Sequence, residues 1–247
     1  MRVTKRRCPL SDSTTAVQTS VHEDVHRPEL LHHFADPQQQ RNSASLGMWI
    51  FLGTEVMFFG GLFCAYLIYR IWYYADFAAA SKSINAALGG TNTAVLICSS
   101  LTVVLAIWAA ETSRRALMLA MLVLTMLFGL GFLGIKGVEY HDKFVEHHVP
   151  GPSFSFEHEQ IPGHPGQYAN PQHAEIFFAL YFIMTGLHAL HMIVGLGIFI
   201  WLFVMAWKGR FTPEYHTPLE IGGLYWHFVD IIWIYLFPLL YLIDRHP

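Results

Sequence analysis

Five ionisable residues lie within long apolar stretches of the sequence, where an unpaired charge is costly. They are the acid Glu55, the histidines His188 and His191 one helical turn apart, and the pair His227 and Asp230 at the same spacing. A charge at the centre of a membrane costs about 2.5–3.5 kcal/mol on insertion scales, so such groups face protein and find partners. Counting along the stretches places all five near one depth. We therefore expect one buried polar cluster, shared among three helices, that can handle protons.

Glu55 is the residue of this set with the sharpest expectation. It lies about nine residues into its stretch, roughly 14 Å deep at 1.5 Å per residue. We predict a hydrogen bond to His191, with His188 as the less favoured partner, and either a shared proton or a neutral acid. Two interpretations stay open at this point. Glu55 either handles protons or is a neutral acid that serves packing alone.

The three histidines also raise the alternative of a membrane b-type cytochrome. Neighbours one turn apart on a helix cannot take opposite faces of one iron. A haem would therefore need His227 opposite His188 or His191. Absorbance of the isolated chain distinguishes this alternative from a chain without haem.

The elements that must position these residues are five long apolar runs. Each run has about 20 residues or more, which suffices to cross a hydrocarbon core of about 30 Å. Only 13% of the residues are charged, against about 25% in soluble domains. The sequence therefore predicts an all-α, integral membrane bundle of five transmembrane helices. The runs are about 46–69, 91–110, 116–138, 176–206 and 222–243, and the fourth is long enough to tilt or project.

The segments outside the runs predict the topology. Residues 1–45 form a polar N-terminal tail, and residues 46–247 form the membrane domain. With the N-terminus in the cytoplasm, the Lys and Arg of the inner segments outnumber those outside, which favours that orientation and puts the C-terminus outside. No apolar stretch follows the basic start, so we expect no cleaved signal. In this orientation the Lys and Arg of the outer segments are Arg70, Lys82, Lys136, Lys143 and Arg245.

The net charge of −3 gives no reason to expect nucleic acid as a partner.

Residues 139–173 form the one long loop expected after the tail, and it would face outward. It contains several histidines and carboxylates, which are ordinary ligands of divalent metals. Their spacing fits no known ligand pattern, so we expect no metal and expect His147, His148 and His158 to tolerate replacement by Ala. The alternative is a metal or docking site.

Two other patterns have simpler explanations. Gly129, Gly131 and Gly134 match the spacing GxGxxG, but they lie within an apolar run rather than between a strand and a helix. Small residues let membrane helices approach closely, so helix packing is expected. The cysteines form no CxxC pair, so neither a disulfide framework nor a thiolate metal site is expected.

Several motifs occur in the order found in one membrane family. They are GMWIFLGTEVMFF at 47–59, NTAVLICSS at 92–100, the pair Glu139–Tyr140, TGLHALH at 185–191 and YWHFVD at 225–230. From about residue 46 to 243 the chain resembles subunit III of the haem-copper oxidases, in its short five-helix bacterial form. Glu139 and Tyr140 correspond to an acid–aromatic pair that ends the family's third helix here.

The resemblance implies a noncatalytic subunit in the bacterial plasma membrane. It would pack directly against subunit I, which holds the haems and copper, beside subunit II and others, and would bind phospholipids. The complex would pass electrons from cytochrome c to oxygen and move protons, and Glu55 would lie near the proton-uptake side. We expect no haem or copper on this chain, since an oxidase core needs more intramembrane histidines.

Two features of the resemblance leave alternatives open. The chain lacks the two N-terminal helices of the long form, so another chain would have to replace them. A subunit of a quinol oxidase, or a relative beside a nitric oxide reductase, is an alternative within the family. A free-standing proton-coupled transporter is the alternative from another class.

Overall fold

The computed structural model describes residues 36–152, 154–156, 160–161, 166–213 and 215–243. It contains helices and no strand in these ranges, and five helices are long and apolar enough to cross a membrane. The predicted all-α fold with five spans is therefore confirmed. In chain order the helices are α1 (Pro37–Trp72), α2 (Tyr74–Lys82), α3 (Ala86–Glu111), α4 (Arg115–Val145), α5 (Pro171–Trp207) and α6 (Thr217–Tyr241).

Every spanning helix except α6 is longer than its apolar run at both ends. Helix α1 begins at Pro37, so the final part of the expected tail is helical, while residues 1–35 lie outside the described residues. Proline suits the first turn of a helix because its missing N–H has no partner there. Contacts within that turn, from Arg41 Nη2 to Gln38 Oε1 (2.8 Å), extend the helix without apolar residues.

The expected outer loop also begins later than residue 139. Helix α4 continues to Val145, so Glu139 and Tyr140 are helical residues. The helix continues past its apolar run because Lys136 and Lys143 are both buried and paired with carboxylates one turn further on, at Glu139 and Glu146. Such pairs at a spacing of three stabilise a helix. The connection to α5 is correspondingly shorter.

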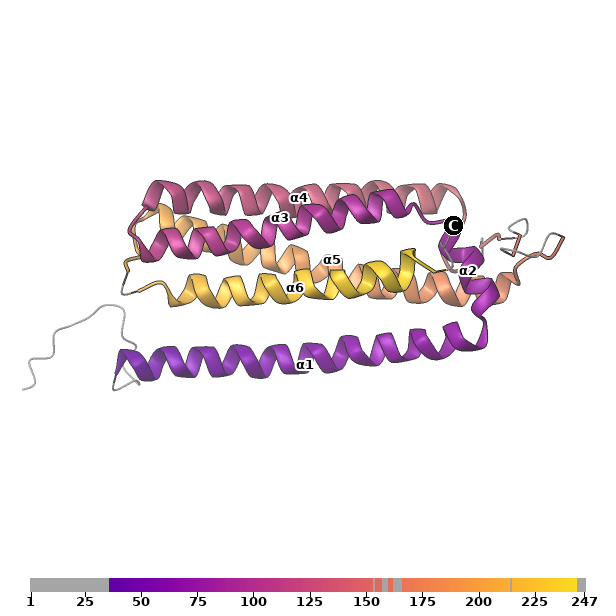
Figure 1. Cartoon of the computed structure of the whole chain (residues 1–247), viewed down its shortest axis with the longest axis horizontal. Helices are drawn as coiled ribbons and strands as arrows, with labels where there is room; N and C mark the ends of the chain where they lie inside the picture. The colour runs from indigo at the N-terminus through magenta and orange to yellow at the C-terminus, as the bar shows by residue number, and fades with distance from the viewer. Residues whose placement is uncertain (1–35, 153, 157–159, 162–165, 214, 244–247) are drawn as a thin grey trace, which may run out of the picture.

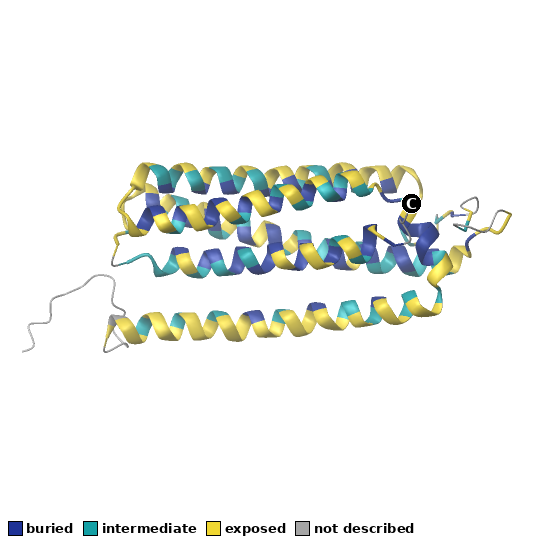
Figure 2. Cartoon of the chain, in the orientation of Figure 1, coloured by how far each residue is buried: buried dark blue, intermediate teal, exposed yellow. Residues whose placement is uncertain are grey.

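Helices α3, α4, α5 and α6 form a bundle, and α1 lies along one side of it (Figure 1). The short helix α2 turns the chain back over the end of the bundle where α6 finishes, which we call the C-side end. The opposite end, with Pro37 and the turns after Glu111 and Trp207, is the N-side end. Helix α1 contacts α5 and α6, yet most of its residues are exposed (Figure 2).

Tryptophan fills the centre of the bundle. Trp226 of α6 packs against the backbones of Gly129 on α4 and Gly195 on α5, where an added Cβ would lie 2.9 and 3.0 Å from the indole. Its Nε1 donates to Ser99 Oγ on α3 at 2.9 Å. The predicted packing role is therefore confirmed for Gly129, whereas Gly131 and Gly134 have open space beside them.

Side chains of α1 and α2 close the C-side end of the bundle. Tyr66 donates to the carbonyl of Leu239 at 2.6 Å, and Ser81 donates to the carbonyl of Leu240 at 2.8 Å. The last carbonyls of a helix have no partner within the helix. The two hydroxyls therefore satisfy the end of α6 and fix α1 and α2 against it.

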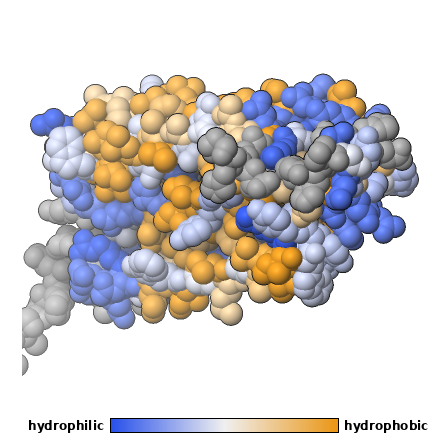
Figure 3. All heavy atoms as spheres, turned by 45° about the vertical axis from the view of Figure 1, so that its right-hand side comes forward, coloured by the Kyte–Doolittle hydropathy of each residue, from blue (hydrophilic) through white to orange (hydrophobic). Residues whose placement is uncertain are grey.

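The distribution of hydrophobic side chains over the surface is the one expected if a membrane surrounds the middle of the molecule. Hydrophobic residues dominate the middle of the visible face, and hydrophilic ones gather toward its ends (Figure 3). Large apolar side chains such as Met57, Ile71 and Trp72 are exposed on α1. Lipid or a partner chain is the environment that such a surface needs.

Candidate functional site: polar groups inside the bundle

Glu55 and His191 are in contact between α1 and α5. Glu55 Oε2 lies 3.2 Å from His191 Nε2, and both side chains are largely buried, at 19% and 16% exposed. This contact agrees with the predicted pairing. The pair is enclosed by Phe59, whose ring meets the imidazole edge-on, and by Tyr225, whose hydroxyl donates to the His191 carbonyl at 3.0 Å.

The second nitrogen of His191 determines what the contact with Glu55 requires. Its Nδ1 lies 2.8 Å from the carbonyl oxygen of Leu187, which can only accept, so Nδ1 carries a proton. A neutral imidazole then has a bare Nε2, and a carboxylate would face it as a second acceptor. One proton must therefore lie between Glu55 and His191, held by a neutral acid or by an imidazolium.

His188 lies in a different environment from His191, although the two are one turn apart. It is 1% exposed and is packed between Phe132 of α4 and Trp233 of α6, with ring centroids at 5.3 and 5.2 Å. Neither ring nitrogen has a hydrogen-bond partner among the described residues. Residues three apart on a helix point about 60° apart, which turns His191 toward α1 and His188 toward the bundle centre.

His227 and Asp230 are also separate from Glu55. His227 Nδ1 lies 2.6 Å from Ser100 Oγ on α3, and Asp230 is buried with no hydrogen-bond partner for either oxygen within the described residues. The expected single cluster is therefore not formed: among the described residues only Glu55 and His191 pair with each other, and His188, His227 and Asp230 have other surroundings. The haem alternative needed His227 opposite His188 or His191, but His227 contacts Ser100 on α3, whereas His188 packs between Phe132 and Trp233 and His191 faces α1.

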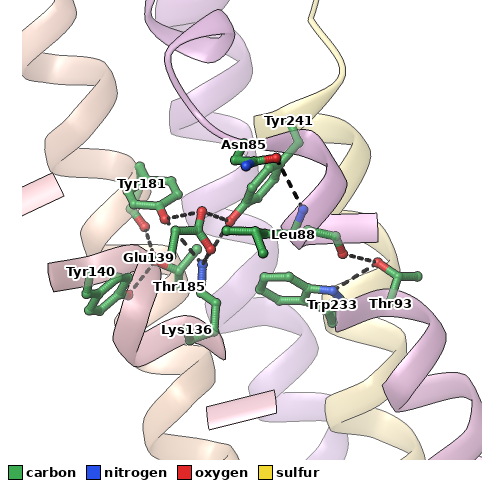
Figure 4. Close-up of polar contacts among 11 residues, drawn as sticks. Asn85, Leu88, Thr93, Lys136, Glu139, Tyr140, Tyr181, Thr185, Trp233 and Tyr241 are labelled. Atoms are coloured by element: carbon green, nitrogen blue, oxygen red, sulfur yellow. Dashed lines mark hydrogen bonds and ion pairs between the residues drawn. The ribbon is translucent and has the colours of Figure 1, made fainter. Parts of the chain in front are cut away.

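A further polar network inside the bundle includes a residue that was expected outside the membrane. Lys136 was counted as an outer charge, yet it is 3% exposed and its Nζ lies 3.0 Å from Glu139 Oε2. Lys136 also donates to the hydroxyls of Tyr181 (3.2 Å) and Tyr241 (2.8 Å) (Figure 4). Both hydroxyls donate to Glu139 Oε1, at 2.9 and 2.6 Å.

This network joins α4, α5 and α6 through a buried ion pair. Aromatic rings surround the ammonium, with the Trp233 centroid 5.0 Å from Nζ, a distance at which a cation is attracted to a ring. Tyr140, the other half of the predicted pair, is bonded to Thr185 at 2.6 Å. The spacing of Lys136 three residues before Glu139 is the sequence signal that would have identified the ion pair.

The described part of the loop after α4 is packed against the protein. His148 stacks on Phe178 at 5.0 Å, and its Nδ1 is 3.1 Å from Glu146. Burial and the nearby Lys143 lower the pKa of His148, while Glu146 opposes this shift. His158 lies outside the described residues. Within the described part of the loop, no three His, Cys, Asp or Glu side chains come together.

At the same end of the bundle, His173 forms a second contact of this kind. Its Nδ1 is 2.6 Å from Asp76, and its ring stacks on Tyr73 with centroids 3.7 Å apart. Asp76 also accepts from the backbone N–H of Asn170 at 2.9 Å. These contacts join the start of α5 to α2, so the histidine and the carboxylate have a structural explanation.

Comparison with known proteins identifies the family. The family model for cytochrome c oxidase subunit III matches residues 171–244. A probable cytochrome c oxidase subunit 3 of Nocardia farcinica is 32% identical over 202 residues, covering 82% of this chain and 89% of the relative. A counterpart in Mycobacterium tuberculosis is 30% identical over 231 residues, covering 94% and 96%. The subunit 3 of a cytochrome bo(3) ubiquinol oxidase of Pseudomonas aeruginosa is 27% identical, covering 93% and 98%. The chain therefore belongs to the cytochrome c oxidase subunit III family, as a multi-pass protein of the bacterial plasma membrane and a subunit of a haem-copper oxidase complex.

Proposed function

We propose that this chain is the noncatalytic subunit III of a proton-pumping oxidase that takes electrons from cytochrome c. It packs against subunit I, beside subunit II, and those partners carry the haems and copper. Relatives named for cytochrome c oxidase reach 32% identity, against 27% for the quinol oxidase relative, which supports cytochrome c as the donor. The N-terminus lies in the cytoplasm, as the positive charges of the inner segments favour.

The contact between Glu55 and His191 is the observation that carries the functional part of the proposal. It requires one proton between two groups that each bind protons, at a partly accessible position between α1 and α5. Such a pair can take up a proton and release it without moving any helix. We assign it the support of proton uptake by subunit I. Phospholipids cover the exposed apolar side chains of α1 that no partner covers.

Purification of the tagged chain in mild detergent tests the assignment of partners. A haem-containing partner should copurify, and the complex should oxidise reduced cytochrome c. The chain separated from its partners should have no Soret absorption. A stoichiometric Soret band on the isolated chain would contradict the noncatalytic role, and purification without any haem protein would contradict the complex.

A quinol oxidase is the second candidate, favoured by the relative from Pseudomonas aeruginosa that matches nearly the whole chain. The same preparation distinguishes the two. Oxygen consumption supported by a quinol, and not by cytochrome c, would assign the chain to a quinol oxidase. It would leave the role of Glu55 to be tested separately.

A further inference from the structure

Three side chains with metal-ligating atoms meet at the N-side end of the bundle, one from the end of α3 and two from the start of α6. Glu111 is the last residue of α3, His216 caps the start of α6, and Glu220 lies one turn into α6. One ligand atom from each lies within 4.8 Å of the others. His216 Nε2 is 3.1 Å from Glu220 Oε1 and 3.9 Å from Glu111 Oε1.

These separations fit a single ion. Zinc binds imidazole nitrogen and carboxylate oxygen at about 2.0–2.2 Å in tetrahedral geometry, so its ligand atoms lie about 3.4 Å apart. The two distances from His216 Nε2, 3.1 Å to Glu220 and 3.9 Å to Glu111, differ from this value by about 0.5 Å or less. An ion placed among the three atoms would therefore need only small side-chain movements.

The exposure of the three side chains suits an ion that is still accessible to water. The His216 side chain is 16% exposed, so the ring is held by its surroundings with Nε2 toward the carboxylates. The Glu111 and Glu220 side chains are 49% and 46% exposed, which leaves room for water as further ligands. Glu220 also borders a cavity of about 250 Å³ between α1 and α6.

The donor set indicates the class of cation. One imidazole with two carboxylates suits Zn²⁺, Mn²⁺ or Fe²⁺, whereas Mg²⁺ prefers oxygen ligands and water. The position of Glu220 in the first turn of α6 has a second explanation, because acids are favourable at a helix N-terminus. That explanation does not account for Glu111, which comes from another helix and faces the same imidazole nitrogen.

We propose that Glu111, His216 and Glu220 form a binding site for one transition-metal dication, which ties the end of α3 to the start of α6. The site uses none of the residues assigned to proton handling or to partner binding. The existence of the metal site is therefore independent of the proposed function. The copurification experiment does not test the metal site, and the metal-binding experiment does not test the proposed function.

Hydrogen exchange of the full chain in detergent, measured by mass spectrometry with added Zn²⁺, tests this site locally. We expect Zn²⁺ to slow exchange in residues 109–113 and 215–221, and Mg²⁺ to have little effect. Glu111→Gln and His216→Asn should each weaken this response by at least about tenfold in Zn²⁺ concentration, because each removes one of three ligands. His173→Asn is the matched control, since it removes a histidine paired with a carboxylate at the other end.

The local readout separates this site from the histidines in the N-terminal tail. Without Zn²⁺, both variants should exchange as the wild type does, which shows that they fold. If His216→Asn does not fold, the half-exposed Glu111→Gln still carries the test. Absence of slowing in the wild type, slowing that persists in Glu111→Gln, or equal slowing by Mg²⁺ would each overturn the proposal.

Discussion

Replacement of Lys136 by Met should destabilise the chain strongly, because it leaves the Glu139 carboxylate buried without its cation. Both side chains are 3% exposed, so water cannot replace the ammonium. Breaking a buried pair by removing one partner costs about 3–5 kcal/mol. Tyr181 and Tyr241 still donate to Glu139 Oε1 in the variant, and they reduce the cost. We therefore expect about 3 kcal/mol, the low end of that range.

The double variant Lys136→Met/Glu139→Gln separates the loss of packing from the unpaired charge. The amide oxygen keeps both tyrosine bonds and carries no charge, so the double variant should recover part of the stability, with about 1–2 kcal/mol still lost. Lys143→Met is the control, because its partner Glu146 is 48% exposed and remains hydrated. Its effect should be smaller than that of Lys136→Met.

Tryptophan fluorescence of the full chain in detergent, followed through denaturant unfolding, measures these differences. The reasoning would be refuted if Lys136→Met cost less than about 1 kcal/mol, the value of an ordinary exposed pair. It would equally be refuted if the double variant were less stable than the single one. That result would mean that the carboxylate does not need the lysine.

Three further predictions follow from other sites. Glu55→Gln should leave assembly intact but slow proton uptake or shorten the active life of the oxidase during sustained oxygen consumption, and unchanged kinetics would leave Glu55 with packing alone. Gly129→Ala should cost about 1–3 kcal/mol through overpacking against Trp226, since the new Cβ would lie 2.9 Å from the indole, while Gly131→Ala has open space and serves as the control in thermal unfolding. The loop around His148 should be most stable above about pH 6.5 and lose stability as the pH falls below it, because its lowered pKa means that only the unfolded loop binds the proton there. Protease cleavage of this loop should then rise on acidification in the wild type but not in His148→Phe, and equal acid sensitivity in both would contradict the role of His148.

The sequence predicted the spans because their signal is local. An uninterrupted apolar run of about 20 residues has few alternatives to a membrane helix. The sequence did not predict where those helices begin and end. Helix α1 begins at Pro37, and α4 continues to Val145, since polar contacts and burial by other elements extend a helix beyond its apolar residues. Helix α2 has no such run and was not predicted.

The pairing of Glu55 with His191 could be predicted because both groups lie at one depth and each needs a partner. The separate surroundings of the other buried polar residues could not be predicted. His188, His227 and Asp230 were also near that depth, but His188 packs between α4 and α6, His227 contacts α3, and Asp230 has no hydrogen-bond partner among the described residues. Depth follows from position along a helix, whereas direction depends on the rotation of that helix against its neighbours.

The sequence by itself determined that this is a five-span membrane protein of the subunit III family, with Glu55 buried beside a histidine. Only the tertiary structure placed Lys136 in the core and joined it to Tyr181 and Tyr241. The physical reason is that these residues come from three different helices, α4, α5 and α6. Their contact is decided by how the helices pack, and tryptophan and glycine at the helix interfaces determine that packing.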